Sequence, residues 1–243
     1  VANLIDSKNE DFKVTATISA SDLPRLARKL FDQGLMHFFG FHFEEAAKCF
    51  SHCVQLEADC ALALGMISLC HSPHYNLSGK LYYELSNHPA VEGKKCDDLG
   101  PFPSQQTAEY YSRSAMEKVN ELHGTEKQIP HVECQIITAI RTRTHHLGID
   151  HLLAEDTLGR PYSNALRELY QQYSDDPEVA YLFADSLMVL NAWNLYEYPS
   201  GRPLSNDVDE VQGVLEDSLT KYPVHPGLCH LYIHLSEMSS DPG

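Results

Sequence analysis

Apolar side chains recur every three to four residues along most of this chain, which is the period of a helix packed on one face. The first such stretch covers residues 21–35, with a serine or aspartate placed to cap the helix and a proline in its first turn. A second stretch covers residues 44–56, after the short turn Phe39-Gly40-Phe41-His42. The sequence therefore predicts a helical hairpin near its start.

The same period continues through later apolar segments, while the alternation typical of strands is hard to find. Turn-forming residues separate these segments, for example Asp175-Asp176-Pro177 and Ser200-Gly201-Arg202-Pro203. Leu158-Gly159-Arg160-Pro161 is expected to be an ordinary turn as well. About nine short helices joined by hairpin-length turns predict an all-α stacked array rather than a closed bundle. Beyond the first hairpin, the predicted helices cover residues 60–70, 107–122, 132–144, 163–173, 177–190, 208–221 and 226–238.

Two regions stand outside this helical pattern. Residues 1–20 are polar and mixed, and we expect a loose lead-in there, before a repeat domain at residues 21–243. Residues 71–106 form a long insertion rich in His, Asn, Gly and Pro, and loops longer than about 12–15 residues tend to be functional or disordered. The chain begins with Val1 instead of methionine, so we expect that processing or truncation has removed the true start.

The first predicted hairpin carries small residues at regular points. Gly34, Ala46, Phe50 and Cys53 are separated by twelve, four and three positions. The small residues among them let the two helices of a hairpin approach closely, while Phe50 is expected to wedge between neighbouring hairpins. The spacing resembles the tetratricopeptide repeat, although an alanine replaces the proline that usually closes the unit. Gly65 belongs to the start of a second, partial unit, thirty-one residues after Gly34.

Several other short segments match one common pattern. They are residues 41–46 (FHFEEA), 60–65 (CALALG), 72–76 (SPHYN), 176–180 (DPEVA) continuing to 192–195 (AWNL), and 225–234 (HPGLCHLYIH). In this combination the chain resembles a large, mostly uncharacterised tetratricopeptide-like family, over roughly residues 25–240. His74 departs from the pattern, because the family tends to have asparagine there. The resemblance implies a longer protein that continues with further helical repeats and a second histidine-containing segment.

The most specific chemistry lies in the last of these segments. Pro226 suits the first turn of a helix, which leaves His225 at or near the N-cap. At about 100° per residue, His230, His234 and Glu237 fall within roughly 60° of one another on one face. Two imidazoles and a carboxylate presented in this way match the ligands of a zinc or non-haem iron site with an open position. His225 lies off that face, and would join from the end of the helix or orient a ligand.

A structural alternative stands beside the metal site. Burying two imidazoles and a carboxylate costs several kcal/mol unless they are paired or metal-bound, and pairing among themselves also meets that need. A hydrogen-bond network without metal, or a small polar ligand, therefore stays open. Leu231 occupies the position where a zinc protease of the H-E-x-x-H type has its general base, which argues against that enzyme class.

Four other residues are candidates for ligand binding. Trp193 and Tyr196 stand close together in an aromatic stretch that would line a groove or cover the end of the core. His74 and Asn76 stand at the start of the long insertion, where they would supply polar contacts.

The composition and net charge of the chain limit the classes of molecule that it is expected to bind. The chain has 34 Asp and Glu against 18 Lys and Arg, a formal net charge of −16, and such a surface repels the phosphate backbone of nucleic acid. No apolar run reaches the roughly 20 residues that span a bilayer, and no signal-peptide pattern opens the chain. The seven cysteines include no C-x-x-C pair, so we expect free or buried thiols. These features favour a soluble protein of the cytoplasm or an organelle lumen over a secreted one.

Two functions follow as hypotheses. The first is a binding or scaffold module, with a groove for a protein, a peptide or a small polar ligand. The second is a metal-dependent enzyme in which His230, His234 and Glu237 hold a divalent ion that activates water, oxygen or a polar substrate.

Overall fold

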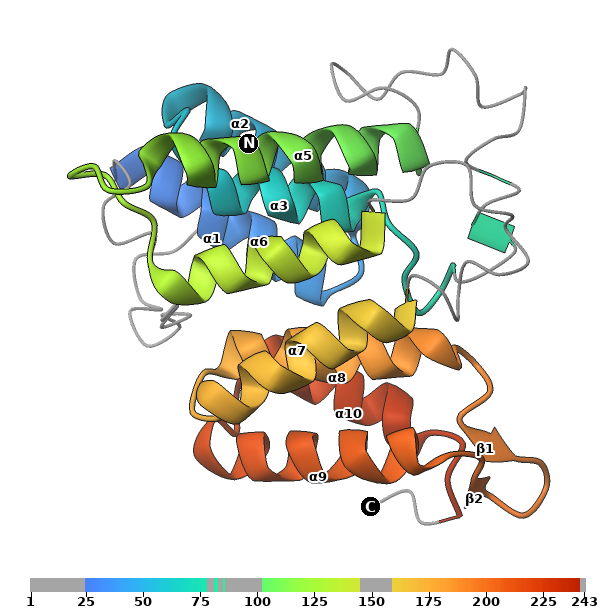
Figure 1. The fold of residues 1–243 in the computed structure, drawn as a ribbon. Coiled ribbons are helices and arrows are strands. Elements are labelled where there is room, and N and C mark those ends of the chain that lie inside the picture. The colour runs from blue at the N-terminus through green and yellow to red at the C-terminus, as the bar shows by residue number, and fades with distance from the viewer. Residues whose placement is uncertain (1–24, 78–80, 83–84, 86–101, 145–158, 241–243) are drawn as a thin grey trace.

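The computed structural model describes residues 25–77, 81–82, 85, 102–144 and 159–240 (Figure 1). These residues form nine helices and one two-stranded sheet, so the all-α prediction is confirmed. The predicted lead-in at residues 1–20 and most of the insertion at residues 71–106 lie outside the described residues. The elements are α1 (Arg25–Phe39), α2 (Phe43–Leu56), α3 (Ala61–Cys70), α5 (Gln105–Leu122), α6 (His131–Thr144), α7 (Arg160–Gln172), α8 (Pro177–Leu190), β1 (Tyr196–Glu197), β2 (Arg202–Pro203), α9 (Asn206–Lys221) and α10 (Pro226–Ser236).

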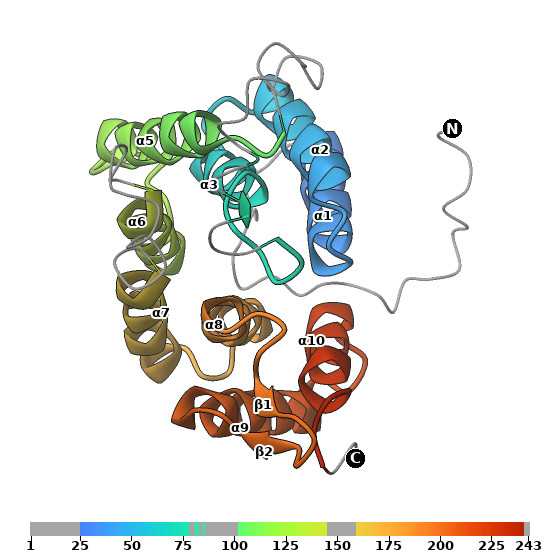
Figure 2. The same ribbon diagram turned by 90° about the vertical axis from the view of Figure 1, so that its right-hand side faces the viewer.

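The helices follow one another around an arc, and each described helix packs against the next (Figure 2). In addition, α3 contacts α6, and α10 contacts both α8 and α1. All of α3 and nearly all of α8 are buried, as expected for helices that are apolar on every side. The arc therefore brings α10 back to α1, with α3 and α8 on the inside.

The close approach predicted within the first hairpin is confirmed at Gly34. A Cβ atom on Gly34 would lie only 2.6 Å from Cε1 of Phe50, so a larger residue would push α1 and α2 apart. The ring of Phe31 meets Phe50 edge-on, with the ring centroids 5.3 Å apart. Gly65 makes a similar approach between α3 and α6, where an added Cβ would lie 3.2 Å from Cδ1 of Ile140.

Capping side chains and prolines decide where several helices begin. Asp176 Oδ1 accepts hydrogen bonds from the backbone N–H groups of Glu178 and Val179, at 3.0 and 3.2 Å, and α8 starts at the following proline. The prediction of an ordinary turn at residues 158–161 is wrong for Arg160 and Pro161, which form the first turn of α7. Proline fits there because its fixed φ is helical and its missing N–H is not needed.

A short hairpin interrupts the helical arc. Tyr196 pairs with Pro203 and Glu197 pairs with Arg202 in an antiparallel register, where the sequence predicted only a connection. Each strand has two residues, which is too short to produce a readable alternation of apolar and polar positions.

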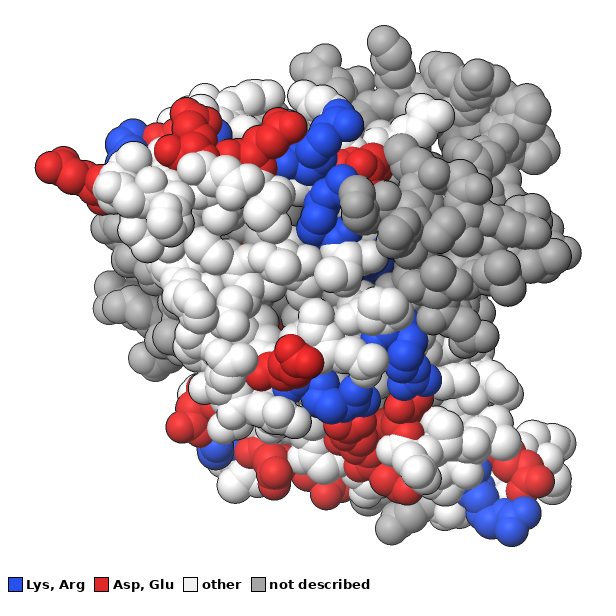
Figure 3. Space-filling view, in the orientation of Figure 1, with Lys and Arg blue, Asp and Glu red and all other residues white. Residues whose placement is uncertain are grey.

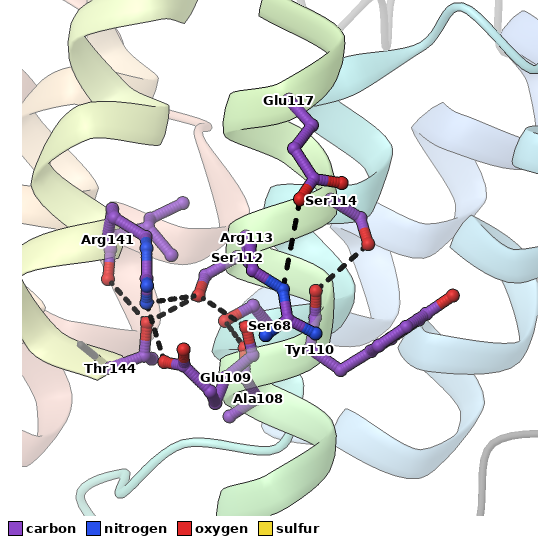
Figure 4. A network of polar contacts seen from close by, with 11 residues as sticks. Ser68, Ala108, Glu109, Tyr110, Ser112, Arg113, Ser114, Glu117, Arg141 and Thr144 are labelled. Carbon is purple, nitrogen blue, oxygen red and sulfur yellow. Dashed lines mark hydrogen bonds and ion pairs between the residues drawn. The ribbon is translucent and has the colours of Figure 1, made fainter. Parts of the chain in front are cut away.

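Polar contacts join neighbouring helices at two places. Ser68 Oγ donates to the Ala108 carbonyl at 2.7 Å, and Arg141 Nη1 donates to Glu109 Oε2 at 2.5 Å, which ties α3, α5 and α6 together (Figure 4). Charged side chains of both signs lie side by side over α7 and α9 (Figure 3). Two bidentate ion pairs link these two helices.

The structure bears on two features predicted from the sequence, the state of the cysteines and the lack of a membrane-spanning segment. The six cysteines within the described residues are free, and Cys53 and Cys70 are fully buried. None of the helices described by the structure combines the length and apolar character needed to cross a membrane.

Candidate functional site

The histidine segment forms α10, as the sequence predicts. Pro226 lies in the first turn, and His225 is the N-cap residue, whose Nδ1 accepts a hydrogen bond from the Leu228 N–H at 3.2 Å. Leu228 and Leu231 are buried and hold one side of the helix against the core. The helix ends at Ser236, which makes Glu237 its C-cap residue. The polar face between these ends carries the candidate site.

His230 faces the end of α1. Its Nδ1 lies 2.5 Å from the carbonyl oxygen of Phe39. A carbonyl can only accept, so Nδ1 carries the proton and donates it to this oxygen. In the neutral ring Nε2 of His230 therefore has a lone pair and no proton.

His234 is held by the residue that closes the helix. Its Nδ1 lies 2.8 Å from Oε1 of Glu237, and a carboxylate also only accepts. The proton of a neutral His234 is therefore on Nδ1 too, and its Nε2 has the lone pair.

The two unprotonated nitrogens face each other. Nε2 of His230 and Nε2 of His234 are 3.1 Å apart. Two lone pairs at that separation repel, and a metal ion bound between the two nitrogens would remove that repulsion.

Aromatic rings surround His234. Phe41 stacks on it with an interplanar angle of 4° and centroids 5.6 Å apart, and Tyr75 and Trp193 follow at 5.1 and 6.0 Å. Phe41 and Trp193 are the only non-glycine residues with positive φ within the described ranges, at 58° and 60°. Such backbone conformations are strained for bulky residues and gather at functional sites. The two imidazoles and the residues around them lie where α10 meets the end of α1, and we call them the seam cluster. The seam cluster consists of Phe39, Phe41, Tyr75, Trp193, His230, His234 and Glu237.

His225 lies apart from the seam cluster's imidazole pair, although the sequence made it a candidate ligand. Its ring packs against Phe39, with centroids 4.9 Å apart, and its Nε2 lies 4.0 Å from Oε1 of Glu178. Because Nδ1 caps α10, the ring is fixed in this direction. Burial lowers the pKa of His225 to about 4, so it is neutral at physiological pH.

Glu178 is a buried acid that sequence reasoning missed. It is 2% exposed, and both carboxyl oxygens lack a hydrogen-bond partner in the part of the chain that the structure describes. Burial, followed by the negative charge of Asp176, raises the pKa of Glu178 to about 9. In the sequence it resembles any acid in the first turn of a helix, where the helix dipole favours negative charge.

The four candidate binding residues differ in how deeply they are buried. Trp193 is 53% exposed and belongs to the seam cluster, whereas Tyr196 is buried in the small hairpin. His74 packs on Phe43 at a centroid distance of 4.3 Å, and burial lowers its pKa to about 4. Asn76 is exposed in the adjoining turn.

Sequence reasoning assigned no role to three residues of the seam cluster. Phe41 and Tyr75 stand in segments that carry the family resemblance, but nothing in their spacing pointed to His234. Phe39 contributes its backbone carbonyl, which no side-chain motif reveals.

The described residues contain no group of three or more His, Cys, Asp or Glu side chains placed to hold a metal ion. Among the described residues of the seam cluster, the two imidazoles are the side chains whose free nitrogens face each other. No protein-family model, no curated protein and no solved structure matches this chain.

Proposed function

We propose that this chain is a tetratricopeptide-like binding protein whose ligand is a divalent first-row transition-metal ion, held by His230 and His234. One observation carries the proposal: both imidazoles use Nδ1–H to bind an acceptor, which leaves both Nε2 lone pairs 3.1 Å apart. A metal ion between them replaces the repulsion with two coordinate bonds.

The separation of the nitrogens fits one metal ion. With metal–nitrogen bonds of about 2.05 Å, an Nε2–Nε2 distance of 3.1 Å corresponds to an angle of about 100° at the metal. Tetrahedral and octahedral complexes both accommodate that angle. Imidazole ligands favour nickel, copper and zinc over magnesium and calcium, which prefer oxygen.

Glu237 has a different role in this proposal from the one its position in the sequence indicated. Its carboxylate binds Nδ1 of His234, and the Phe39 carbonyl binds Nδ1 of His230. Carboxylates and carbonyls that accept from the second nitrogen fix the tautomer and make the imidazole a better ligand. Both groups therefore support the metal ligands without touching the metal.

The enzyme hypothesis is the second candidate. Two protein ligands leave several coordination positions for water or another molecule, and open positions are what metal-dependent catalysis requires. The partly exposed His234 and the exposed Trp193 give this side of the pair access to solvent.

The repeat architecture is part of the proposal. The close approach at Gly34 supports it, because it places a small residue where the two helices of a hairpin of this kind need one. In such an array the imidazole pair of His230 and His234 lies where the last described helix, α10, contacts the first, α1.

Metal titration tests the proposal. Protein stripped with a chelator is titrated with Zn²⁺, Ni²⁺ and Mg²⁺ by calorimetry, together with His230→Ala, His234→Ala and the control His52→Ala, which replaces an exposed histidine of α2. We expect one Zn²⁺ or Ni²⁺ per chain in the wild type and the control, no Mg²⁺ binding, and loss of binding in both other variants. Absence of Zn²⁺ and Ni²⁺ binding by the wild type would contradict the proposal.

A further inference from the structure

The last residue of α1 and the turn after it contact α10. We define the seam as the contacts that Phe39 and Phe41 make with residues of the helix α10 and its cap. Across the seam, His230 binds the Phe39 carbonyl over a sequence separation of 191 residues. Phe41 adds ring contacts to His230, with centroids 4.4 Å apart, and to His234. The seam thus consists largely of the residues that the proposed metal site uses.

Gly227 allows this approach. A Cβ atom at this position would lie 2.6 Å from Cδ2 of Tyr181 and 2.8 Å from Cδ1 of Phe39. Any larger residue would force α10 away from Phe39. The absence of a side chain at Gly227 therefore lets His230 reach the Phe39 carbonyl.

We infer that metal binding and closure of the seam are thermodynamically linked through the His230–Phe39 hydrogen bond. This inference rests on the proposed function and adds a consequence that metal binding alone does not imply. With the seam closed, the Phe39 carbonyl holds the proton of His230 on Nδ1 and keeps Nε2 available to a metal. With the seam open, no acceptor holds the proton on Nδ1, so the tautomer with its proton on Nε2 competes with coordination and weakens metal binding.

The linkage acts in the other direction as well. A metal on Nε2 withdraws electron density from the ring, so Nδ1–H becomes a stronger donor to the Phe39 carbonyl. Because coupling between two equilibria is reciprocal, a metal that prefers the closed seam must also stabilise it. A metal ion bound to the imidazole pair would consequently stabilise the contact between α10 and α1, the helices at the two ends of the arc.

Hydrogen exchange on the wild-type protein tests the inference without any variant. The amides of Gly40, Phe41 and His42 bond to carbonyls in the last turn of α1, and they exchange when that turn opens. We expect saturating Zn²⁺ to slow their exchange by about fivefold or more, and Mg²⁺ to leave it unchanged. Unchanged exchange in protein that calorimetry shows to bind Zn²⁺ would overturn the linkage while the metal site stands. Failure to bind Zn²⁺ at all would overturn both.

A pair of glycine variants supplies the reciprocal measurement. Gly227→Ala places a methyl group against Phe39, whereas Gly213→Ala adds one in α9 where no atom lies within 4 Å. We expect Gly227→Ala to weaken Zn²⁺ binding at least tenfold, as loss of a supporting partner of a ligand does, and Gly213→Ala to bind like the wild type. Wild-type affinity in folded Gly227→Ala would refute the inference. If Gly227→Ala does not fold, the exchange experiment alone decides.

Discussion

The imidazole of His234 lies parallel to the phenyl ring of Phe41, with an interplanar angle of 4° and ring centroids 5.6 Å apart. Phe41 reaches this position from the turn after α1 by adopting a left-handed backbone conformation, with φ at 58°. The ring also stacks on Phe43, with centroids 5.5 Å apart. The strain of the turn is therefore offset by aromatic contacts at the seam.

Replacement of Phe41 separates these two effects. We expect Phe41→Ala to lower the free energy of unfolding by about 1–2 kcal/mol, because the ring contacts are lost while the strained backbone remains. Phe41→Gly also loses the ring but removes the strain, so it should cost about 1 kcal/mol less than alanine. Urea denaturation of both variants measures the difference. A control, Leu204→Ala, removes an exposed apolar side chain and should change stability little. Equal stability of the alanine and glycine variants would show that the turn is not strained.

Glu178 and His225 make stability depend on pH in opposite directions. Glu178 has a pKa of about 9 in the folded protein against an ordinary value of 4.5, so between these values unfolding releases its proton. Its contribution to stability is complete below pH 4.5 and is lost as the pH rises through 9. His225 has a pKa of about 4 in the folded protein against 6.5, so unfolding takes up a proton between these values. Its contribution is complete above pH 6.5 and is lost as the pH falls through 4.

Above pH 6.5 only the Glu178 effect remains of these two. The free energy of unfolding should fall between pH 6.5 and 9, with a Glu178 contribution of at most about 1.4 kcal/mol per pH unit. Glu178→Gln keeps the shape of the side chain without its titration, and we expect a shallower slope. Glu126→Gln, an exposed acid in a turn, should keep the wild-type slope. Urea denaturation at pH 6.5, 7.5 and 8.5 makes the comparison, and identical slopes for all three proteins would contradict the buried, protonated state of Glu178.

The helices could be predicted from the sequence because their signal is local. The period of apolar residues placed α8 at residues 177–190, which is its observed extent, and α2 within one residue of its start. The same local geometry put His230 and His234 on one face of α10, with the C-cap residue Glu237 beside His234. These predictions needed only the rise and turn of a helix.

The hydrogen-bond partners of the histidine ring nitrogens could not be predicted from the sequence, because they depend on contacts between distant parts of the chain. The acceptor for His230 is a backbone carbonyl 191 residues away, so no motif in the segment contains it. The sequence predicts that His225 lies off the shared face and joins from the end of the helix or orients a ligand, but its role as the cap of α10 turns its ring toward Glu178. The sequence shows which residues share a face, and tertiary packing decides what each one meets.

The ion pair between Arg167 and Glu210 should couple α7 to α9. Arg167 Nε and Nη2 donate to the two carboxylate oxygens of Glu210 at 2.7 and 2.9 Å, and this bidentate geometry is the favourable one. A double-mutant cycle with Arg167→Met and Glu210→Gln should give a coupling energy of about 0.5–1.5 kcal/mol in low salt. Because both side chains are partly exposed, the energy should shrink in 1 M NaCl. A coupling energy near zero in low salt would show that the pair contributes nothing to the α7–α9 contact.

Two glycines in helices should respond in opposite ways to the same substitution. Gly34 lies against Phe50, and a methyl group there would sit 2.6 Å from the ring, so Gly34→Ala should destabilise the protein by about 1–3 kcal/mol. Gly213 lies in α9 with no atom within 4 Å of an added Cβ, so Gly213→Ala should stabilise it by about 0.5–1 kcal/mol through helix propensity alone. Thermal and urea unfolding of both variants measure the two signs. If Gly34→Ala were neutral or stabilising, α1 and α2 would not pack as closely as the repeat spacing requires, and the architecture proposed for the array would lose its main support.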